Sequence, residues 1–261
     1  MTETPQTERF GAEYFQDPLG HFARLREDRA VTPVVMPDGG RVWLVTRYAD
    51  VRGALADPRL AKDWLAHMTP DGWTPDPVNG YLNRHLLNMD PPDHTRLRRL
   101  VSKAFTPRRV ESLRPRVEAI TASLADAIEG RDEVDLVESF ALPLPVTVIC
   151  ELLGVPATDQ DSFAAWSRTM LSSVASPEEF REAAAAMFGY FTELLAAKRR
   201  SPSDDLLSAL TAARDEEDSL SEHELISMGF LLLIAGHETT VNLIASGMLA
   251  LLLHPAELAR L

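Results

Sequence analysis

The sequence predicts a mainly α-helical protein with a small β-hairpin near its N-terminus. Strand-like apolar runs occur as a single pair, whereas apolar residues at helical spacing dominate from residue 91 onward. The stretch from Glu222 to His254 contains no proline, and one helix of that length would span roughly 50 Å. Its apolar residues lie all around the helix, so we expect it to run through the core of a fold larger than 261 residues.

Composition excludes several classes of protein. At 45% apolar and 25% charged residues, the chain has the composition of a globular domain. Its one cysteine, Cys150, excludes an internal disulfide and a cysteine-rich metal cluster, and a net charge of −13 argues against general nucleic-acid binding. Residues 1–10 lack the apolar core of a signal peptide. Because His237 and Glu238 interrupt the apolar stretch 225–253, we expect a buried helix of a cytoplasmic protein and no membrane span.

The first part of the chain is predicted to hold the hairpin and two short helices. Val31–Met36 and Arg41–Thr46 flank the turn sequence Pro-Asp-Gly-Gly, which is typical of a β-hairpin. We expect short helices over Pro18–Arg29 and Tyr48–Ala56. Residues 62–89 are rich in proline and glycine and form a long irregular loop, a feature that is usually functional in a compact chain.

Helices are predicted for most of the remaining chain. Their expected ranges are 91–105, 107–129, 139–153, 158–172, 177–200 and 203–213, with an acidic surface turn at 215–218. Ser221 and Glu224 form a capping box that starts the long helix. Pro255 ends that helix and opens another, which the chain leaves without a cap, so we expect the chain to be a truncated piece of a longer protein.

The middle of the long helix carries an unusual group of polar and small residues. The run Leu231-Leu-Leu-Ile-Ala-Gly-His-Glu-Thr-Thr240 places a carboxylate where burial is expensive unless it is paired. Threonine here can bond the carbonyl four residues earlier, and Ala235 and Gly236 would let a flat ligand approach the backbone. The alternative is a polar kink that faces another helix. Val241 stands where a zinc-binding H-E-x-x-H motif needs histidine, so no metal site is predicted.

A second segment, Asp90-Pro-Pro-Asp-His-Thr-Arg-Leu-Arg98, begins the helix after the long loop. Asp90 is a candidate cap for this helix. His94 and Arg98 are four residues apart on one helix face, where they could grip a carboxylate or a phosphate. The alternative is a solvated basic face. Residues 84–116 are basic on an otherwise acidic protein, which favours an acidic partner.

In order and spacing, these segments resemble the cytochrome P450 superfamily of haem-thiolate monooxygenases. The resemblance rests on M-D-P-P-D-H-T-R-L-R and on A-G-H-E-T-T within the long helix. Further matching segments are Lys62-Asp-Trp64, F-T-P-R-R-V-E-S-L-R-P-R-V, L-P-L-P and E-L-L-G-V-P. The chain is most similar to actinobacterial enzymes that hydroxylate macrolides and other polyketides. The resemblance implies that residues 1–261 are the N-terminal part of one P450 domain, truncated after the long central helix.

The resemblance also implies which residues bind the cofactors. His94 and Arg98 would bind the propionates of haem b. Ala235 and Gly236 would line the dioxygen pocket, and Leu87 would contact the haem.

For the reaction, the resemblance implies that Glu238 and Thr239 deliver protons to dioxygen. Residues 62–89, 166–190 and the early part of the long helix would frame a small hydrophobic substrate. Electrons from NAD(P)H would arrive through a ferredoxin-like donor that docks on the basic face of Arg96, Arg99 and Lys103.

The sequence departs from the family in one important respect. The Gly-rich loop that supplies the haem thiolate is absent, and Cys150 lies in an apolar helical pattern that predicts a buried core residue. The family's E-x-x-R spacing occurs at 111/114, 178/181 and 257/260, too early in the chain, and we interpret these as coincidences. The monooxygenase interpretation therefore expects this chain alone to be inactive. The alternative is a non-catalytic helical binding or scaffold remnant of the same fold.

Overall fold

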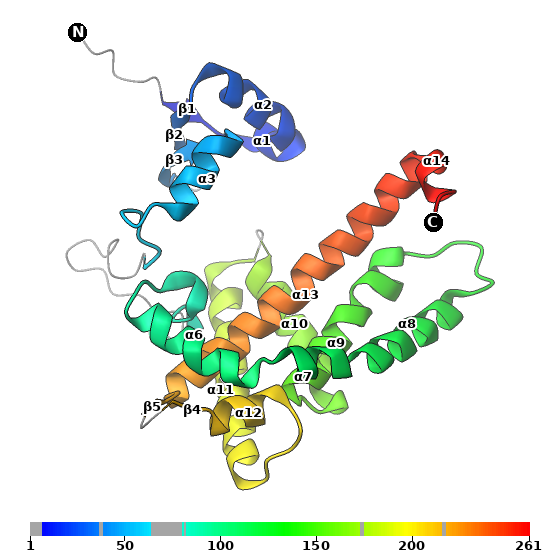
Figure 1. Cartoon of the computed structure of the whole chain (residues 1–261). Coiled ribbons are helices and arrows are strands. Elements are labelled where there is room, and N and C mark those ends of the chain that lie inside the picture. Colours follow the sequence, from blue (N-terminus) through cyan, green and yellow to red (C-terminus); the bar gives the residue numbers. More distant parts are fainter. Residues whose placement is uncertain (1–6, 37–38, 64–79, 81, 173–174, 216–217) are drawn as a thin grey trace. The chain divides into compact units, whose positions relative to one another are not determined.

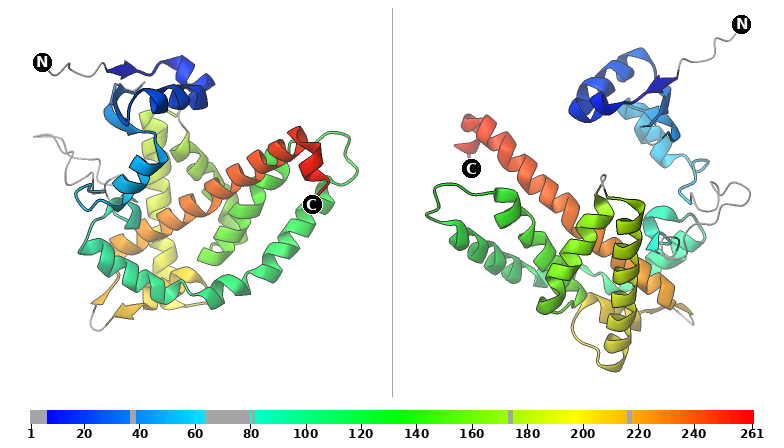
Figure 2. Two further views of the ribbon diagram at one scale, coloured as in Figure 1. Left: turned by 45° about the horizontal axis from the view of Figure 1, so that its top comes forward. Right: turned by 180° about the vertical axis from the view of Figure 1, so that it is seen from behind.

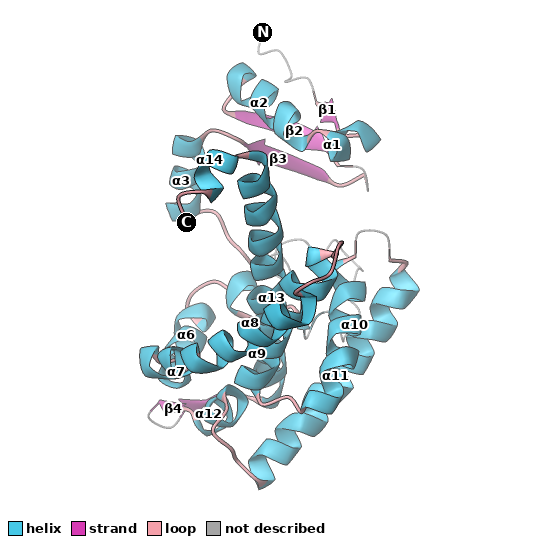
Figure 3. Ribbon diagram, turned by 90° about the vertical axis from the view of Figure 1, so that its right-hand side faces the viewer, coloured by secondary structure: helices cyan, strands magenta, loops and turns pink. Residues whose placement is uncertain are grey.

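The computed structural model describes residues 7–36, 39–63, 80, 82–172, 175–215 and 218–261. It divides into two compact units, Met1–Ala61 and Lys62–Leu261, which are described separately below as the first and second units (Figure 1). The predicted mainly helical architecture with a small sheet is confirmed (Figure 3). The assignment of residues 1–261 to one domain stays a prediction.

The first unit contains the predicted hairpin. Strands β2 (Val31–Val35) and β3 (Arg41–Val45) pair antiparallel, with Val31 opposite Val45. A short strand, β1 (Glu8–Arg9), adds to β2 in parallel and was not predicted, because two residues are too few to show alternation. The helices of this unit are α1 (Ala12–Gln16), α2 (Pro18–Asp28) and α3 (Tyr48–Ala56), of which α2 and α3 were predicted.

The second unit is built from helices around one hydrophobic core. They are η1 (Leu86–Asn88), α6 (Asp93–Ala104), α7 (Pro107–Ser112), α8 (Arg114–Ile128), η2 (Val137–Ala141), α9 (Pro143–Leu153), η3 (Ala157–Asp159), α10 (Gln160–Leu171), α11 (Pro177–Arg200), α12 (Leu206–Ala212), α13 (Glu222–Leu253) and α14 (Pro255–Leu258). Both α9 and α11 pack on α13 (Figure 2). The largest fully buried side chains include Phe163 and Phe191, from α10 and α11.

Several predicted boundaries were wrong. The helix expected over 107–129 is two helices that meet at Leu113, since Pro115 near the start of α8 has no N–H to continue the hydrogen-bond ladder. The helix expected from 139 begins as the π-helical turn η2 before α9, and the one expected from 158 begins as the short 3₁₀ turn η3. The acidic turn is flanked by two short paired strands, β4 (Arg214–Asp215) and β5 (Asp218–Ser219). Most of the predicted loop 62–89 lies outside the described residues.

Helix α13 is continuous, and the predicted capping box is present. The Ser221 hydroxyl accepts from the N–H of Glu224, and the Glu224 carboxylate accepts from the N–H of Ser221. Only part of the helix lies in the core, however. Its buried residues all fall between Leu225 and His237, whereas Leu243 in the C-terminal half is 72% exposed. Among the described residues, α13 is also the one helix that is long and apolar enough to cross a membrane.

Two glycines allow the neighbouring helices to approach α13 closely. A Cβ on Gly229 would lie 2.6 Å from a ring carbon of Phe191 in α11. A Cβ on Gly236 would lie 3.0 Å from the Ile149 side chain of α9. Gly236 therefore has a packing role in addition to the ligand-approach role that the sequence predicted.

Candidate functional site

The first part of the candidate site is on α6. His94 is half-buried and Arg98 is exposed, one helical turn apart. In the part of the chain that the structure describes, neither side chain has a hydrogen-bond or ion-pair partner. Asp90 was predicted to cap this helix, but its side chain does not do so. Its carboxylate instead accepts hydrogen bonds from the backbone N–H groups of Lys62 and Asp63 at 2.8 and 2.9 Å. Its carboxylate thus anchors the segment before α6 to the segment 28 residues earlier.

Arg96, on the same helix, is already paired. Its guanidinium forms ion pairs with Glu224 and, at 3.3 Å, with Asp218. Because Glu224 also belongs to the capping box of α13, this contact joins α6 to the start of that helix. Of the three residues of the predicted docking face, Arg96 is therefore half-buried and paired with two carboxylates, and Arg99 and Lys103, which also have interaction partners, lie exposed.

The second part of the site is the middle of α13. The Thr239 hydroxyl donates to the Ala235 carbonyl at 2.8 Å, and the Thr240 hydroxyl donates to the Gly236 carbonyl at 3.1 Å. Both bonds are of the kind that the sequence predicted for threonine within a helix. Ala235, Gly236 and Thr239 are exposed, so this face of the helix is open to a ligand.

Ala235 and Gly236 line an apolar cavity of about 400 Å³ at the junction of α8, α9 and α13. The cavity is also reached by Phe105, at the C-terminal end of α6. It therefore brings the end of the α6 segment to the small residues of α13. His94, Arg98 and Leu87 do not line this cavity, and Leu87 is 62% exposed in η1.

Glu238 lies on a different side of α13. It is half-buried and lines a second cavity of about 320 Å³ between α10 and α13. Arg168 and Ser172 line the same cavity, together with apolar residues that include Leu142 and Leu171. The structure thus places Glu238 at a different cavity from Ala235 and Gly236, and Thr239, its partner in the predicted proton delivery, lines neither of these two cavities.

His237 has the role that the sequence analysis left open as the alternative, a polar contact with another helix, although the partner itself was not predicted. Its side chain is 5% exposed, with Nε2 3.1 Å from the hydroxyl of Ser167 and Nδ1 2.8 Å from the Leu233 carbonyl oxygen. This contact joins α10 to α13. No periodicity in the sequence identifies a partner 70 residues away.

The sequence analysis missed His85. It is 5% exposed, its ring lies 6.5 Å from that of Phe230, and Nδ1 is buried without a hydrogen-bond partner. Burial in these surroundings lowers the pKa of His85 to about 4.

We expect this histidine to make stability depend on pH. The unfolded chain, with a histidine pKa near 6.5, binds more protons than the folded chain between about pH 6.5 and pH 4. The free energy of unfolding should therefore fall as the pH drops through this window, by up to about 3 kcal/mol. Urea unfolding across the window should show that His85→Leu flattens the slope, whereas His254→Gln, at an exposed position, leaves it in place. An unchanged slope in His85→Leu would contradict the assignment.

The described residues fit a haem only in part. The hydrogen-bond donors of His94 and Arg98, which have no partner among the described residues, suit propionates, and the apolar cavity beside Ala235 and Gly236 suits the edge of a porphyrin. Cys150 does not fit an axial ligand, because it is fully buried in the core and burial raises the pKa of its thiol to about 12. This burial confirms the prediction that Cys150 is a core residue.

The three E-x-x-R pairs have simple local explanations. Glu111–Arg114, Glu178–Arg181 and Glu257–Arg260 form ion pairs three residues apart, at 2.7, 3.2 and 2.7 Å. All six side chains are more than half exposed. Such pairs are ordinary features of helix surfaces.

Comparison with known proteins identifies the family. No family model matches the sequence. Cytochrome P450 107B1 of Saccharopolyspora erythraea is 49% identical over 271 residues, covering 99% of this chain and 65% of that protein. The mycinamicin IV hydroxylase/epoxidase of Micromonospora griseorubida is 46% identical, covering 90% of this chain and 59% of that protein. The ligand-free P450 monooxygenase TamI superimposes with a TM-score of 0.81 at 45% identity, covering 99% of this chain and 61% of that one.

These relatives extend beyond the region that the chain matches, since it spans less than two thirds of the length of each. Within that region the matches cover nearly the whole chain. Sequence identity and fold therefore agree, and the chain belongs to the cytochrome P450 superfamily.

Proposed function

We propose that these residues form part of a haem-thiolate monooxygenase. It would insert one oxygen atom from dioxygen into a small hydrophobic secondary metabolite of the macrolide or polyketide kind. The observation that carries the proposal is the exposed Ala235–Gly236–Thr239 face of α13 beside an apolar cavity. The relative named as a mycinamicin IV hydroxylase/epoxidase supports the proposed substrate class.

His94 and Arg98 would hold the haem through its propionates. An imidazole N–H and a guanidinium on one helix face can each donate a hydrogen bond to a carboxylate. Both side chains are without competing partners among the described residues, which leaves these donors available. When bound, the haem supplies the activation of dioxygen. We propose that its axial thiolate comes from outside these 261 residues, because Cys150 is buried in the core.

Thr239 and Glu238 would manage protons. The Thr239 hydroxyl is anchored by its bond to Ala235, which fixes the position of its oxygen on the exposed face of α13. From there the hydroxyl can donate a proton to a ligand on this face, provided that another group returns a proton to the hydroxyl. Glu238, half-buried and lining the cavity shared with Arg168, can exchange protons with water and act as the acid–base relay.

The neighbouring threonines provide the test. Thr239→Ala and Thr240→Ala each remove one hydroxyl that is bonded back to the helix; Thr239 is exposed, and Thr240 is half-buried in the wall of the apolar cavity. The variants would be made in the chain joined to the part of the Saccharopolyspora relative that the chain does not cover. We expect Thr239→Ala to lower product formed per electron by about tenfold or more, with peroxide released instead, because proton transfer contributes about 10²–10⁴-fold. Thr240→Ala should form nearly as much product per electron as the wild type. Equal product per electron in the two variants would contradict the proposed relay role of Thr239.

We further propose an acidic, ferredoxin-like electron donor at the exposed end of α6, near Arg99 and Lys103. Arg96 would contribute less than the sequence suggested, because Glu224 and Asp218 already offset its charge. A cytoplasmic location also remains our proposal. It rests on the polar residues His237 and Glu238 in the middle of α13, where a membrane span would be apolar.

A further inference from the structure

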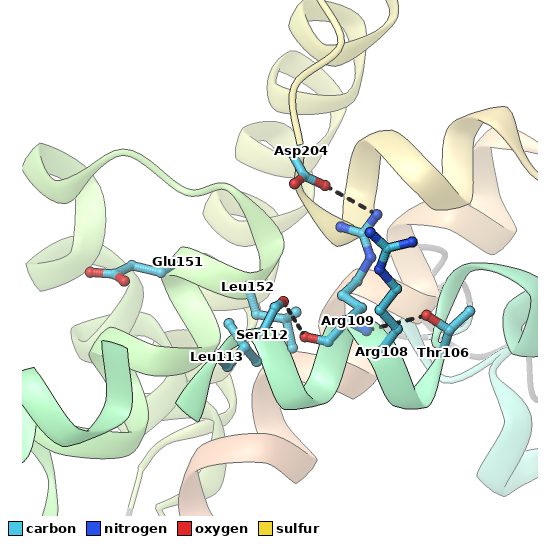
Figure 4. A pocket seen from close by; sticks show the side chains of 8 residues that line it. All are labelled: Thr106, Arg108, Arg109, Ser112, Leu113, Glu151, Leu152 and Asp204. Atoms are coloured by element: carbon cyan, nitrogen blue, oxygen red, sulfur yellow. Dashed lines mark hydrogen bonds and ion pairs between the residues drawn. The ribbon is translucent and has the colours of Figure 1, made fainter. Parts of the chain in front are cut away.

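A cavity of about 430 Å³ in the second unit brings two adjacent arginines to one place (Figure 4). Arg108 and Arg109, on α7, extend to the same side of the helix, toward Asp204 (Figure 4). The hydroxyls of Thr106 and Ser112 also line the cavity. None of these residues belongs to the cavities beside α13.

The charge of Arg109 is poorly compensated. Its side chain is only 24% exposed, and a guanidinium offers five N–H donors. Its ion-pair partner in the described chain is Asp204, at 3.4 Å, whereas charge-assisted bonds are usually about 2.7–2.9 Å. Asp204 is fully exposed, so water screens this contact and weakens it.

The rest of the cavity adds positive charge. Arg108 is exposed and has no ion-pair partner among the described residues. The second carboxylate in the wall, Glu151, is held by Arg116 at 2.6 Å, and its side chain extends away from the two arginines (Figure 4). Two guanidinium groups therefore face one weakly held carboxylate. Like charges that converge in this way are unfavourable unless an anion joins them.

We propose that this cavity binds a phosphate dianion, either inorganic phosphate or the phosphate group of a small metabolite. Two guanidinium groups match the oxygens of a phosphate, and the Thr106 hydroxyl at the rim can add a donor. At about 30 Å³ per water the cavity holds more than ten waters, so the anion would enter with part of its hydration shell. The proposal does not depend on haem binding or on the proposed reaction.

Isothermal titration calorimetry of the 261-residue chain, fused to a soluble protein, tests the proposed phosphate binding. Inorganic phosphate and glycerol phosphate would be titrated separately at constant ionic strength, with the fusion partner alone as the blank. We expect saturable binding of at least one of them, and the comparison identifies the source of the phosphate group. Arg108→Gln and Arg109→Gln should each weaken binding about tenfold, which corresponds to about 1.4 kcal/mol, or one lost charge-assisted bond.

Two further variants make the result decisive. Asp204→Asn removes the competing carboxylate and should strengthen binding several-fold. Arg114→Gln makes the same charge change at an exposed arginine paired with Glu111, outside the cavity, and should leave binding unchanged. Arg108 is exposed, so its variant reports on binding even if Arg109→Gln disturbs the fold. The proposal is overturned if chloride competes as well as phosphate, if Arg114→Gln weakens binding as much as Arg108→Gln, or if nothing binds.

Discussion

Replacing Asp205 with alanine is expected to lower the free energy of unfolding by about 3–5 kcal/mol. The same change at the neighbouring Asp204 should cost less than about 1 kcal/mol. The two carboxylates differ in burial, since Asp205 is 4% exposed and Asp204 is fully exposed. Removing Asp205 leaves the ammonium of Lys198, itself only 12% exposed, without its ion-pair partner at 2.5 Å.

Asp205 is held by a complete set of donors. Its carboxylate accepts from Lys198, from the hydroxyl of Ser203 and from the N–H of Ser208 at 2.7 Å. Burial alone would raise the pKa of Asp205, but these hydrogen bonds outweigh it and the pKa is lowered. This contribution to stability is therefore present at neutral pH and is lost as the pH falls below about 3.9, the ordinary aspartate value.

The ion pair between Lys198 and Asp205 also explains why residue 154 is a glycine. Gly154 ends α9 with φ at +73°, and a Cβ there would collide with Lys198 and Asp205. The pair thus packs against the C-terminal end of α9. Urea unfolding of Asp205→Ala and Asp204→Ala measures the difference, and Lys198→Met provides the reciprocal variant. Equal midpoints for the two aspartate variants would show that the ion pair contributes nothing beyond a surface contact.

The helices that were predicted correctly are those whose signals are local. Helix α11 begins at Pro177 after Ser176 and α13 begins after Ser221, and each start has a capping box that three or four residues encode. The hairpin β2–β3 has a turn sequence between its strands. In these segments, propensity and tertiary packing favour the same structure, so sequence alone was sufficient.

For two polar side chains, a partner distant in the sequence decides the outcome. Arg96 lies on a face that reads as a basic docking surface, yet Glu224, 128 residues later, pairs with it. His237 reads as an interruption of an apolar helix, yet Ser167 in α10 satisfies it. Neither partner lies within the same helix, so no helical spacing reveals it. The candidate residues on α13, by contrast, were selected because glycine, glutamate and threonine are locally unfavourable within a buried helix, and their roles stay predictions.

The 261-residue chain reconstituted with haem is expected to show no thiolate-type Soret band after reduction and addition of carbon monoxide. A thiolate ligand favours O–O cleavage by donating electron density to the iron, and Cys150 is the single cysteine of the chain. Its thiol is fully buried in α9, and with a pKa raised to about 12 almost none of it is ionised at neutral pH. Any haem that binds would be held mainly through His94 and Arg98, so we also expect no monooxygenation.

The exposed half of α13 should make the same sample poorly soluble. Leu243, Leu249, Leu252 and Leu253 are each at least 59% exposed on this helix, and an apolar patch of this kind favours association. Joining the chain to the remaining part of the Saccharopolyspora relative should restore both solubility and the thiolate band. In that longer protein Arg98→Ala should lower haem retention, whereas Arg114→Ala, which removes a cation outside the site, should not. A thiolate-type band in the 261-residue chain that disappears in Cys150→Ser would show instead that the core around α9 opens to let this thiol reach the iron.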